Sequence, residues 1–189
     1  MLVYVATIFT VINLYKGSLL RVQNDQLRVM ASTDPLTRLS NRREMNRRLT
    51  EICAGSDRRY VIGLADIDNF KKVNDTYGHD QGDTVLSAVA GIMTDSLSEN
   101  GSASRWGGEE FLFIIPDAGT DEGLKYAESM IKAVSSKQFT SDGKTFSVTM
   151  TVGLCEGQQG DNIEKVINRA DSRLYKGKHN GKNRVEYTD

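Results

Sequence analysis

Cysteine, proline and tryptophan are scarce in this sequence: its 189 residues include two, two and one of them, respectively. The two cysteines, Cys53 and Cys155, make neither a disulfide framework nor a metal-ligand spacing, so we expect a protein of the reducing cytoplasm. An excess of charge of one sign is also missing. The formal net charge is −1, which argues against broad nucleic-acid binding.

The sequence also lacks a hydrophobic run long enough for a membrane span at its N-terminus. The uncharged, mostly apolar segment from Leu2 to Tyr15 has 14 residues, whereas a span requires about 20. It has no basic leader and no obvious cleavage site, so a secretory signal is not predicted. Two interpretations stay open. The segment is either the end of a transmembrane helix, followed on the cytoplasmic side by Lys16 and Arg21, or a helix that packs on a partner chain.

A short heptad pattern follows this segment. Leu20 and Leu27 are seven residues apart, as are Val22 and Val29, which favours a coiled-coil stalk over two repeats. The Asp-Pro pair that follows Thr33 ends the helix, because the residue before proline avoids helical backbone angles. We therefore predict an apolar segment and helical stalk over residues 1–33 and one globular domain over residues 34–189, for which the 39% apolar content is sufficient.

The domain alternates between helical and strand patterns. Hairpins mixed with crossover helices predict an α+β fold, in which helices surround a largely antiparallel central sheet. The alternation of apolar and polar residues over 146–152 predicts a half-buried antiparallel strand. Helices are expected over about 41–53, 70–77, 82–97, 121–134 and 161–175, and strands over 60–66, 102–106, 111–115, 146–152 and 184–187.

The segment RWGGEEF, residues 105–111, is the most informative one in the chain. The Gly107-Gly108 pair between two strand-forming runs predicts a hairpin, because both positions tolerate positive φ. A phosphate can approach a turn closely at a glycine such as Gly108, and Glu109 or Glu110 beside it can hold a divalent metal there. Taken alone, the motif fits a solvated hairpin tip equally well.

A second acidic motif follows the apolar run over residues 60–65. Asp66 and Asp68 come at the end of this predicted buried strand, where carboxylates are costly unless they bind a metal or pair with a cation. Mg²⁺ usually takes one or two carboxylates together with phosphate oxygens, and Asp66 and Glu109 can supply them.

Taken together, five stretches of the chain resemble the GGDEF family, the diguanylate cyclases. They occur in the family's order and cover the chain from about Met30 to its end. The signature is GGEEF rather than GGDEF, a variant that the family accepts because either acid brings an oxygen ligand. The resemblance implies the palm-like fold of nucleotide cyclases. The stretches are DPLTRLSNR (34–42), ADIDNFKKVNDTYGHDQGD (65–83), RWGGEEF (105–111), MTVGL (150–154) and RADSRLYKGKHNGKNRV (169–185).

The resemblance also implies which residues bind the metal ions, accept the proton and contact the guanine ring. Mg²⁺, two ions per GTP with Mn²⁺ as a substitute, would be held by Asp66, Glu109 and the carbonyl oxygen of Ile67. Glu109 is also the candidate for taking the proton of the attacking 3′-hydroxyl. Asn74 and Asp83 would read the guanine edge.

The resemblance further implies phosphate contacts from lysines. Position 182 is often arginine in the family, and Lys182 loses the bidentate geometry of that residue. His79 belongs to the candidate substrate-binding set, although a local structural role is the more usual one for this residue. The remaining phosphate contacts would come from Lys71, Gly108 and Lys178. The residues expected to support the site through hydrogen bonds to its ligands are Asp68, Asp75, Arg105 and Glu110.

The implied reaction joins two GTP into cyclic di-GMP, a bacterial second messenger, and releases two pyrophosphates. Each domain holds one GTP, so catalysis requires a two-fold homodimer, in the cytoplasm or at the cytoplasmic face of the inner membrane. Two alternatives are a catalytically silent GGDEF domain that binds GTP or acts as a scaffold, and a mononucleotide cyclase or polymerase palm.

Tight inhibition by the product is predicted to be missing. Many family members carry an R-x-x-D inhibitory motif whose Asp lies six residues before the first signature glycine. Counting back from Gly107 places Ser98 at the Arg position and Gly101 at the Asp position. Neither residue can make the charge-assisted hydrogen bonds of the motif.

Overall fold

The computed structural model describes residues 15, 32–54 and 59–188. Contacts divide the chain into two units, Met1–Thr33 and Asp34–Asp189, and the structure below is that of the second. Apart from Tyr15, Ser32 and Thr33, the predicted apolar segment and stalk over residues 1–33 lie outside the described residues. No helix in the described ranges is long and apolar enough to cross a membrane.

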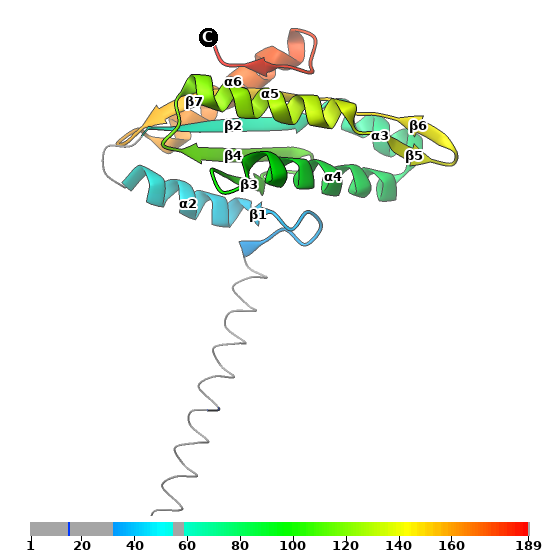
Figure 1. The fold of residues 1–189 in the computed structure, drawn as a ribbon, viewed down its shortest axis with the longest axis horizontal. Coiled ribbons are helices and arrows are strands. Elements are labelled where there is room, and N and C mark those ends of the chain that lie inside the picture. The colour runs from blue at the N-terminus through cyan, green and yellow to red at the C-terminus, as the bar shows by residue number, and fades with distance from the viewer. Residues whose placement is uncertain (1–14, 16–31, 55–58, 189) are drawn as a thin grey trace, which may run out of the picture. The chain divides into compact units, whose positions relative to one another are not determined.

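A six-stranded sheet forms the centre of the domain, in the order β1-β3-β4-β2-β7-β8 (Figure 1). The three inner pairings are antiparallel, and the short edge strands β1 and β8 add in parallel. The predicted α+β fold with a largely antiparallel sheet is therefore confirmed. The strands are β1 (Ser40–Asn41), β2 (Arg59–Ile67), β3 (Ser102–Arg105), β4 (Glu110–Pro116), β7 (Met150–Gln158) and β8 (Val185–Glu186).

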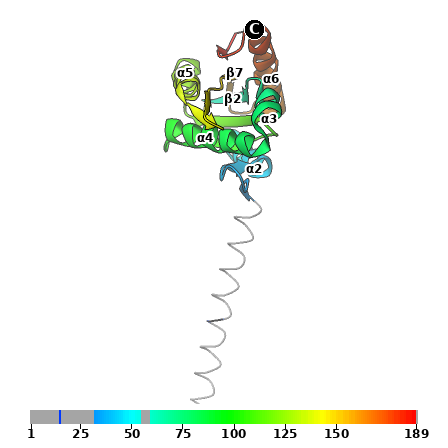
Figure 2. The same ribbon diagram turned by 90° about the vertical axis from the view of Figure 1, so that its right-hand side faces the viewer.

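Helices cover both faces of the sheet (Figure 2). Val61 and Ala65 of β2 join a core with α4 (His79–Leu97) and α5 (Thr120–Ser136), whereas Ile62 and Leu64 join a second core with α2 (Arg42–Ala54) and α6 (Ile163–His179). Strand β2 is thus buried on both sides, as its continuous apolar run predicts. The short helix α3 (Phe70–Tyr77) follows β2 and packs beside α4.

The predicted strand over 146–152 is wrong in its bounds and its exposure. Its first residue ends β6 (Lys144–Phe146), which pairs only with β5 (Phe139–Ser141) in a separate hairpin. Residues from Met150 onward belong to β7, which is buried almost throughout. The hydroxyls of Thr149 and Thr151 donate to the carboxylate of Asp68, and Thr151 is fully buried.

Two helix ends also differ from the sequence prediction. Helix α4 begins at His79 rather than at Gly82, and α6 continues to His179 rather than ending at Tyr175. The additional turn of α6 matters most, because it places Lys178 at the end of a helix that packs against β7.

Gly153 of β7 sets the distance between the sheet and α6. A Cβ at this position would lie 2.0 Å from the carbonyl oxygen of Ala170 and 2.3 Å from the backbone nitrogen of Leu174, and backbone atoms cannot turn away. We expect Gly153→Ala to lower the free energy of unfolding by about 1–3 kcal/mol, as overpacking does.

Gly91→Ala is the matched control for this prediction. Gly91 is exposed in α4, and nothing lies within 4 Å of its added Cβ. Alanine is the better helix former there and should raise stability by about 0.5–1 kcal/mol. Urea unfolding followed by circular dichroism measures both variants. A Gly153→Ala protein as stable as wild type would contradict the packing argument.

Candidate active site

Three carboxylates gather where β2 and β4 meet. Asp66 pairs in register with Glu110, and the backbone N–H of Ile67 donates to the carbonyl oxygen of Glu109 (3.4 Å). Burial raises the pKa of all three carboxyls. For Glu109 and Glu110 the next cause is the charge of Asp66. The cluster therefore favours the arrival of positive charge.

The donor set fits a divalent cation that is shared with a ligand. Among the described residues, no three His, Cys, Asp or Glu side chains form a metal cage by themselves. Mg²⁺ does not require one, because it is usually bound by one or two carboxylates plus phosphate oxygens. Asp66, Glu109 and the carbonyl of Ile67 supply hard oxygen donors of this kind.

The signature turn is held at its base and leaves Gly108 open. The backbone N–H groups of Trp106 and Gly107 donate to the carbonyl of Glu110 (2.8 and 3.1 Å). Arg105 donates to the carbonyl of Gly108 through Nη2 and Nε (2.8 and 3.1 Å) and pairs with Asp34 at 3.3 Å. Arg105 thus joins the signature turn to the turn that opens the domain.

The predicted reason for the two glycines is wrong. Among the described residues with positive φ, neither Gly107 nor Gly108 appears. A Cβ on Gly107 would lie 2.5 Å from Oε2 of Glu110, so a larger residue there would have to displace the end of that side chain. Gly108 is exposed, and no atom lies within 4 Å of its Cβ position, so a ligand can approach its backbone.

Asp68 is the most heavily hydrogen-bonded carboxylate of the site. Its residue is 3% exposed, and it accepts from the hydroxyls of Thr149 and Thr151 (both 2.7 Å), from Nζ of Lys178 (2.7 Å) and from the backbone N–H of Asn183 (3.0 Å). Although burial acts in the opposite direction, these donors hold the pKa of Asp68 below its usual value. The carboxylate oxygens of Asp68 are thus occupied by hydrogen bonds from the protein itself.

The structure brings two of the three predicted phosphate lysines to this cluster. Lys178 pairs with both Asp66 (2.5 Å) and Asp68 (2.7 Å). Lys182 reaches across to the amide oxygen of Asn69 at the start of α3 (2.6 Å). Lys71 is exposed on the first turn of α3, and no described residue pairs with its ammonium.

The two predicted guanine-reading residues lie on adjoining helices. Asn74 of α3 is half-buried against α4, because Gly82 gives it room: a Cβ on Gly82 would lie 1.9 Å from Oδ1 of Asn74. Asp83 follows Gly82 and is exposed. His79 is exposed at the start of α4 without a hydrogen-bonding partner for its ring among the described residues, and Asp75 is exposed on α3.

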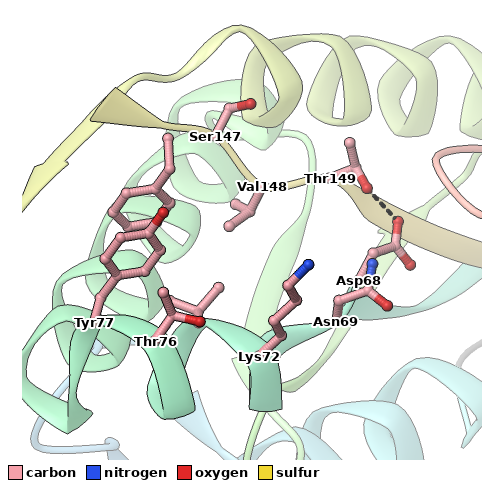
Figure 3. A pocket seen from close by; sticks show the side chains of 10 residues that line it. Asp68, Asn69, Lys72, Thr76, Tyr77, Ser147, Val148 and Thr149 are labelled. Carbon is pink, nitrogen blue, oxygen red and sulfur yellow. Dashed lines mark hydrogen bonds between the residues drawn. The ribbon is translucent and has the colours of Figure 1, made fainter. Parts of the chain in front are cut away.

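A groove of about 370 Å³ lies beside α3 (Figure 3). Lys72 and Thr76 extend from α3 toward Val148, and the Asp68–Thr149 hydrogen bond forms one end. The opposite end is closed by the stacked rings of Tyr77 and Phe146, whose centroids are 4.1 Å apart. Its lining does not include Asp66, Glu109 or the predicted guanine readers. The groove therefore adjoins the predicted site only through Asp68.

The sequence did not indicate all of the residues that support the site. The pattern over 146–152 predicts a solvent-facing side for Thr149 and Thr151, and no motif points to a role for Asn183. The sequence does contain one indication of these contacts. A carboxylate at the end of a buried strand, such as Asp68, requires hydrogen-bond donors, and the threonines of the MTVGL motif and its neighbour can supply them. Asp34 was also missed; it accepts from the N–H and hydroxyl of Thr37 (both 2.8 Å) as well as from Arg105.

The positions of the inhibitory motif line a second groove, of about 240 Å³, between the end of α4 and β1. Ser98 is exposed there, and Gly101 is tightly packed: a Cβ at Gly101 would lie 2.8 Å from the carbonyl oxygen of Ile114. An aspartate at this position would therefore require the backbone to shift.

A largely antiparallel sheet presents carboxylates at a hairpin, and lysines from the last helix and the loop after it lie beside them. This arrangement defines a palm-like domain of the nucleotide-cyclase class. Residues 31–184 match the family described as diguanylate cyclase, GGDEF domain. The chain belongs to this family, which confirms the resemblance of its five motifs.

Named relatives show the same family. The chain is 35% identical over 162 residues to the diguanylate cyclase DgcP of Pseudomonas aeruginosa, covering 84% of this chain and 24% of that protein. It is 37% identical over 176 residues to the response regulator PleD of Caulobacter vibrioides, covering 88% and 38%. The chain thus spans well under two thirds of these relatives.

Solved structures share the fold. The coiled coil and GGDEF domain of DgcB from Caulobacter crescentus, in complex with c-di-GMP, is similar with a TM-score of 0.88 and 31% identity, covering 93% of this chain and 95% of that one. The active GGEEF domain of a diguanylate cyclase from Vibrio cholerae gives a TM-score of 0.68 at 29% identity, covering 80% and 98%.

Replacing Thr151 by valine tests the Asp68 network. The side chain of Thr151 is fully buried, and valine has nearly the same shape but no donor. We expect Thr151→Val to lower the free energy of unfolding by about 1.5–3 kcal/mol, the usual worth of a hydrogen bond to a charged group. Chemical denaturation measures this loss.

The control for this prediction is Thr94→Val. The Thr94 hydroxyl donates only to the carbonyl of Ala90 within α4, and the residue is exposed. Its replacement should change stability by less than about 0.5 kcal/mol, as at most surface positions. Equal effects of the two substitutions would show that Asp68 does not depend on Thr151.

Proposed function

We propose that this chain is a diguanylate cyclase that condenses two GTP into cyclic di-GMP with release of two pyrophosphates. The observation that carries the proposal is the convergence of Asp66 and Glu109 with Lys178 beside the open turn at Gly108. Carboxylates, lysines and an exposed glycine backbone together suit a triphosphate and its metal.

The chain's own residues would bind and orient the triphosphate. Asp66, Glu109 and the carbonyl oxygen of Ile67 would hold Mg²⁺, two ions per GTP, with Mn²⁺ as a substitute. When bound, the metal supplies charge neutralisation on the phosphate oxygens. Lys178 and Lys182 bring positive charge to the same end of the sheet.

Glu109 is the proposed acceptor for the proton of the attacking 3′-hydroxyl. With the protein's own groups alone, burial and the nearby charge of Asp66 raise its pKa. A bound metal would lower this pKa, so the proposed role rests on the position of Glu109 beside the metal and not on its base strength. Asn74 and Asp83 would select guanine, because a carboxylate accepts hydrogen bonds that adenine cannot donate. The close packing of α3 on α4 at Gly82 sets their spacing.

One domain provides half of the reaction in this proposal. Each GTP is held by one protomer, and its α-phosphate is attacked by the 3′-hydroxyl of the GTP on the other, so the active species is a two-fold homodimer. The activity per protomer should therefore rise with protein concentration. A constant specific activity in a protein that stays monomeric during turnover would contradict this.

Product analysis tests the proposal against its alternatives. Purified full-length chain is incubated with GTP and Mg²⁺, and the products are identified by mass. Cyclic di-GMP supports the proposal, cyclic GMP would indicate a mononucleotide cyclase, and unchanged GTP would indicate a silent domain. ATP added in direct competition should be used far less than GTP. Comparable use of the two would overturn the role of Asp83.

Neutral isosteres of the two proposed metal ligands should abolish turnover. Asp66→Asn and Glu109→Gln each remove a charge with little change of shape, and we expect each to lower kcat by at least about 10²-fold. Glu128→Gln, an exposed residue on α5, is the control and should keep wild-type turnover. Near-normal activity of either site variant would refute the assignment.

Cyclic di-GMP should bind weakly away from the active site. The inhibitory arginine is replaced by Ser98, and Gly101 has no space for an aspartate. Each missing charge-assisted bond is worth about 1.5–3 kcal/mol, and about 1.4 kcal/mol is tenfold in affinity. Calorimetry of the wild-type chain with cyclic di-GMP measures this. Submicromolar binding that persists when the active site is saturated with a GTP analogue would contradict the prediction.

A further inference from the structure

Lys178 occupies one of the proposed metal ligands, the carboxylate of Asp66. Its Nζ donates to Oδ1 of Asp66 (2.5 Å), to the carbonyl oxygen of Asp66 (3.2 Å) and to Oδ1 of Asp68 (2.7 Å). An ammonium group has three donors, so these contacts match its full capacity. Of the two carboxylates, Asp66 is a proposed metal ligand, and the oxygens of Asp68 are occupied by hydrogen bonds from the protein.

The lysine is held in this place by its surroundings. Asp68 is fixed by Thr149, Thr151 and the N–H of Asn183. The end of α6 lies close to β7 because Gly177 is bare: a Cβ there would lie 2.8 Å from Cγ2 of Thr151. The side chain of Lys178 is only 20% exposed. Asp68 therefore anchors the ammonium beside Asp66.

A divalent cation and this ammonium compete for Asp66. Two positive groups on one carboxylate repel each other strongly in a partly buried site. Among the cations of the described chain, Lys178 is the one paired with Asp66. A triphosphate changes this balance, because its oxygens can accept hydrogen bonds from the lysine and also bind the metal.

We propose that Lys178 keeps divalent metal away from Asp66 until a triphosphate draws the ammonium off it, so that metal and nucleotide enter the site together. This rests on the proposed function for the role of Asp66 as a metal ligand. Metal binding at Asp66 thus depends on bound nucleotide, and the hydrogen bond from Lys178 to Asp68 keeps the ammonium nearby.

Mn²⁺ binding to the full chain tests this without any turnover. Free Mn²⁺ is measured by electron paramagnetic resonance during titration. Lys178→Met should bind Mn²⁺ in the absence of nucleotide about tenfold more tightly than wild type, within the range usual for coupled sites. The same variant should bind the Mn²⁺ complex of a non-hydrolysable GTP analogue more weakly. A purely structural defect would not move the two affinities in opposite directions.

Three variants control the experiment. Lys176→Met removes a lysine that pairs with Glu186 instead and should bind Mn²⁺ like wild type. Lys178→Arg keeps the charge and should bind nucleotide-free Mn²⁺ no more tightly than wild type. Asp66→Asn combined with Lys178→Met should lose the tighter Mn²⁺ binding, which places the ion at Asp66.

Lys178→Gln and a wild-type measurement guard against a folding defect. Glutamine can still donate to the buried Asp68 but carries no charge, so it should tighten nucleotide-free Mn²⁺ binding as methionine does. In wild-type chain with ¹³C-labelled lysine, the Lys178 Cε resonance, identified by its absence from Lys178→Arg, should stay in place with Mg²⁺ alone and shift with Mg²⁺ and the GTP analogue.

Two results would overturn the proposal. One is a folded neutral variant that binds Mn²⁺ no more tightly than wild type, and the other is a Lys178 resonance that shifts with Mg²⁺ alone. Both are independent of product formation. If no cyclic di-GMP forms but Lys178→Met binds Mn²⁺ more tightly, the proposed reaction is rejected and the competition between Lys178 and metal is kept. If cyclic di-GMP forms but Mn²⁺ binding is not tightened, the reaction is kept and the competition is rejected.

Discussion

The buried carboxylate of Asp68 is the interaction on which the arrangement of the site depends. A buried charge is tolerated only when it is paired and hydrogen-bonded, so Asp68 draws donors from separate parts of the chain. Thr151 comes from β7, Lys178 from the end of α6 and Asn183 from the loop that follows. Removing any donor loosens the connection of the C-terminal segment to the end of β2.

Close backbone packing complements this charge network. Gly153 lets α6 lie directly on β7, and Gly82 lets Asn74 lie against α4. Both glycines act through the space they leave rather than through unusual backbone angles. Arg105 does similar work with hydrogen bonds, since it ties the signature turn to Asp34. The site is thus positioned by contacts outside its proposed ligand-binding atoms.

The carboxylates of the site differ in how well their negative charge is compensated by neighbouring groups. The pKa of Asp66, Glu109 and Glu110 is raised, first by burial, whereas the donors around Asp68 lower its pKa. Asp66 and Asp68 of the same motif therefore differ: Asp68 holds segments of the chain together, and Asp66 would bind the metal in the proposed function.

The family, the doubly buried strand β2 and the order of the five helices described in the domain could be predicted from the sequence alone, because these depend on local patterns and short motifs. The tertiary structure was needed to show that Thr149 and Thr151 face a buried carboxylate, since an alternating pattern looks the same whether its polar side meets water or Asp68. It also showed that α6 reaches Lys178 and that Gly153 is required for the close packing of α6 on β7. These features depend on contacts between segments far apart in the chain, and local residue preferences do not encode such contacts.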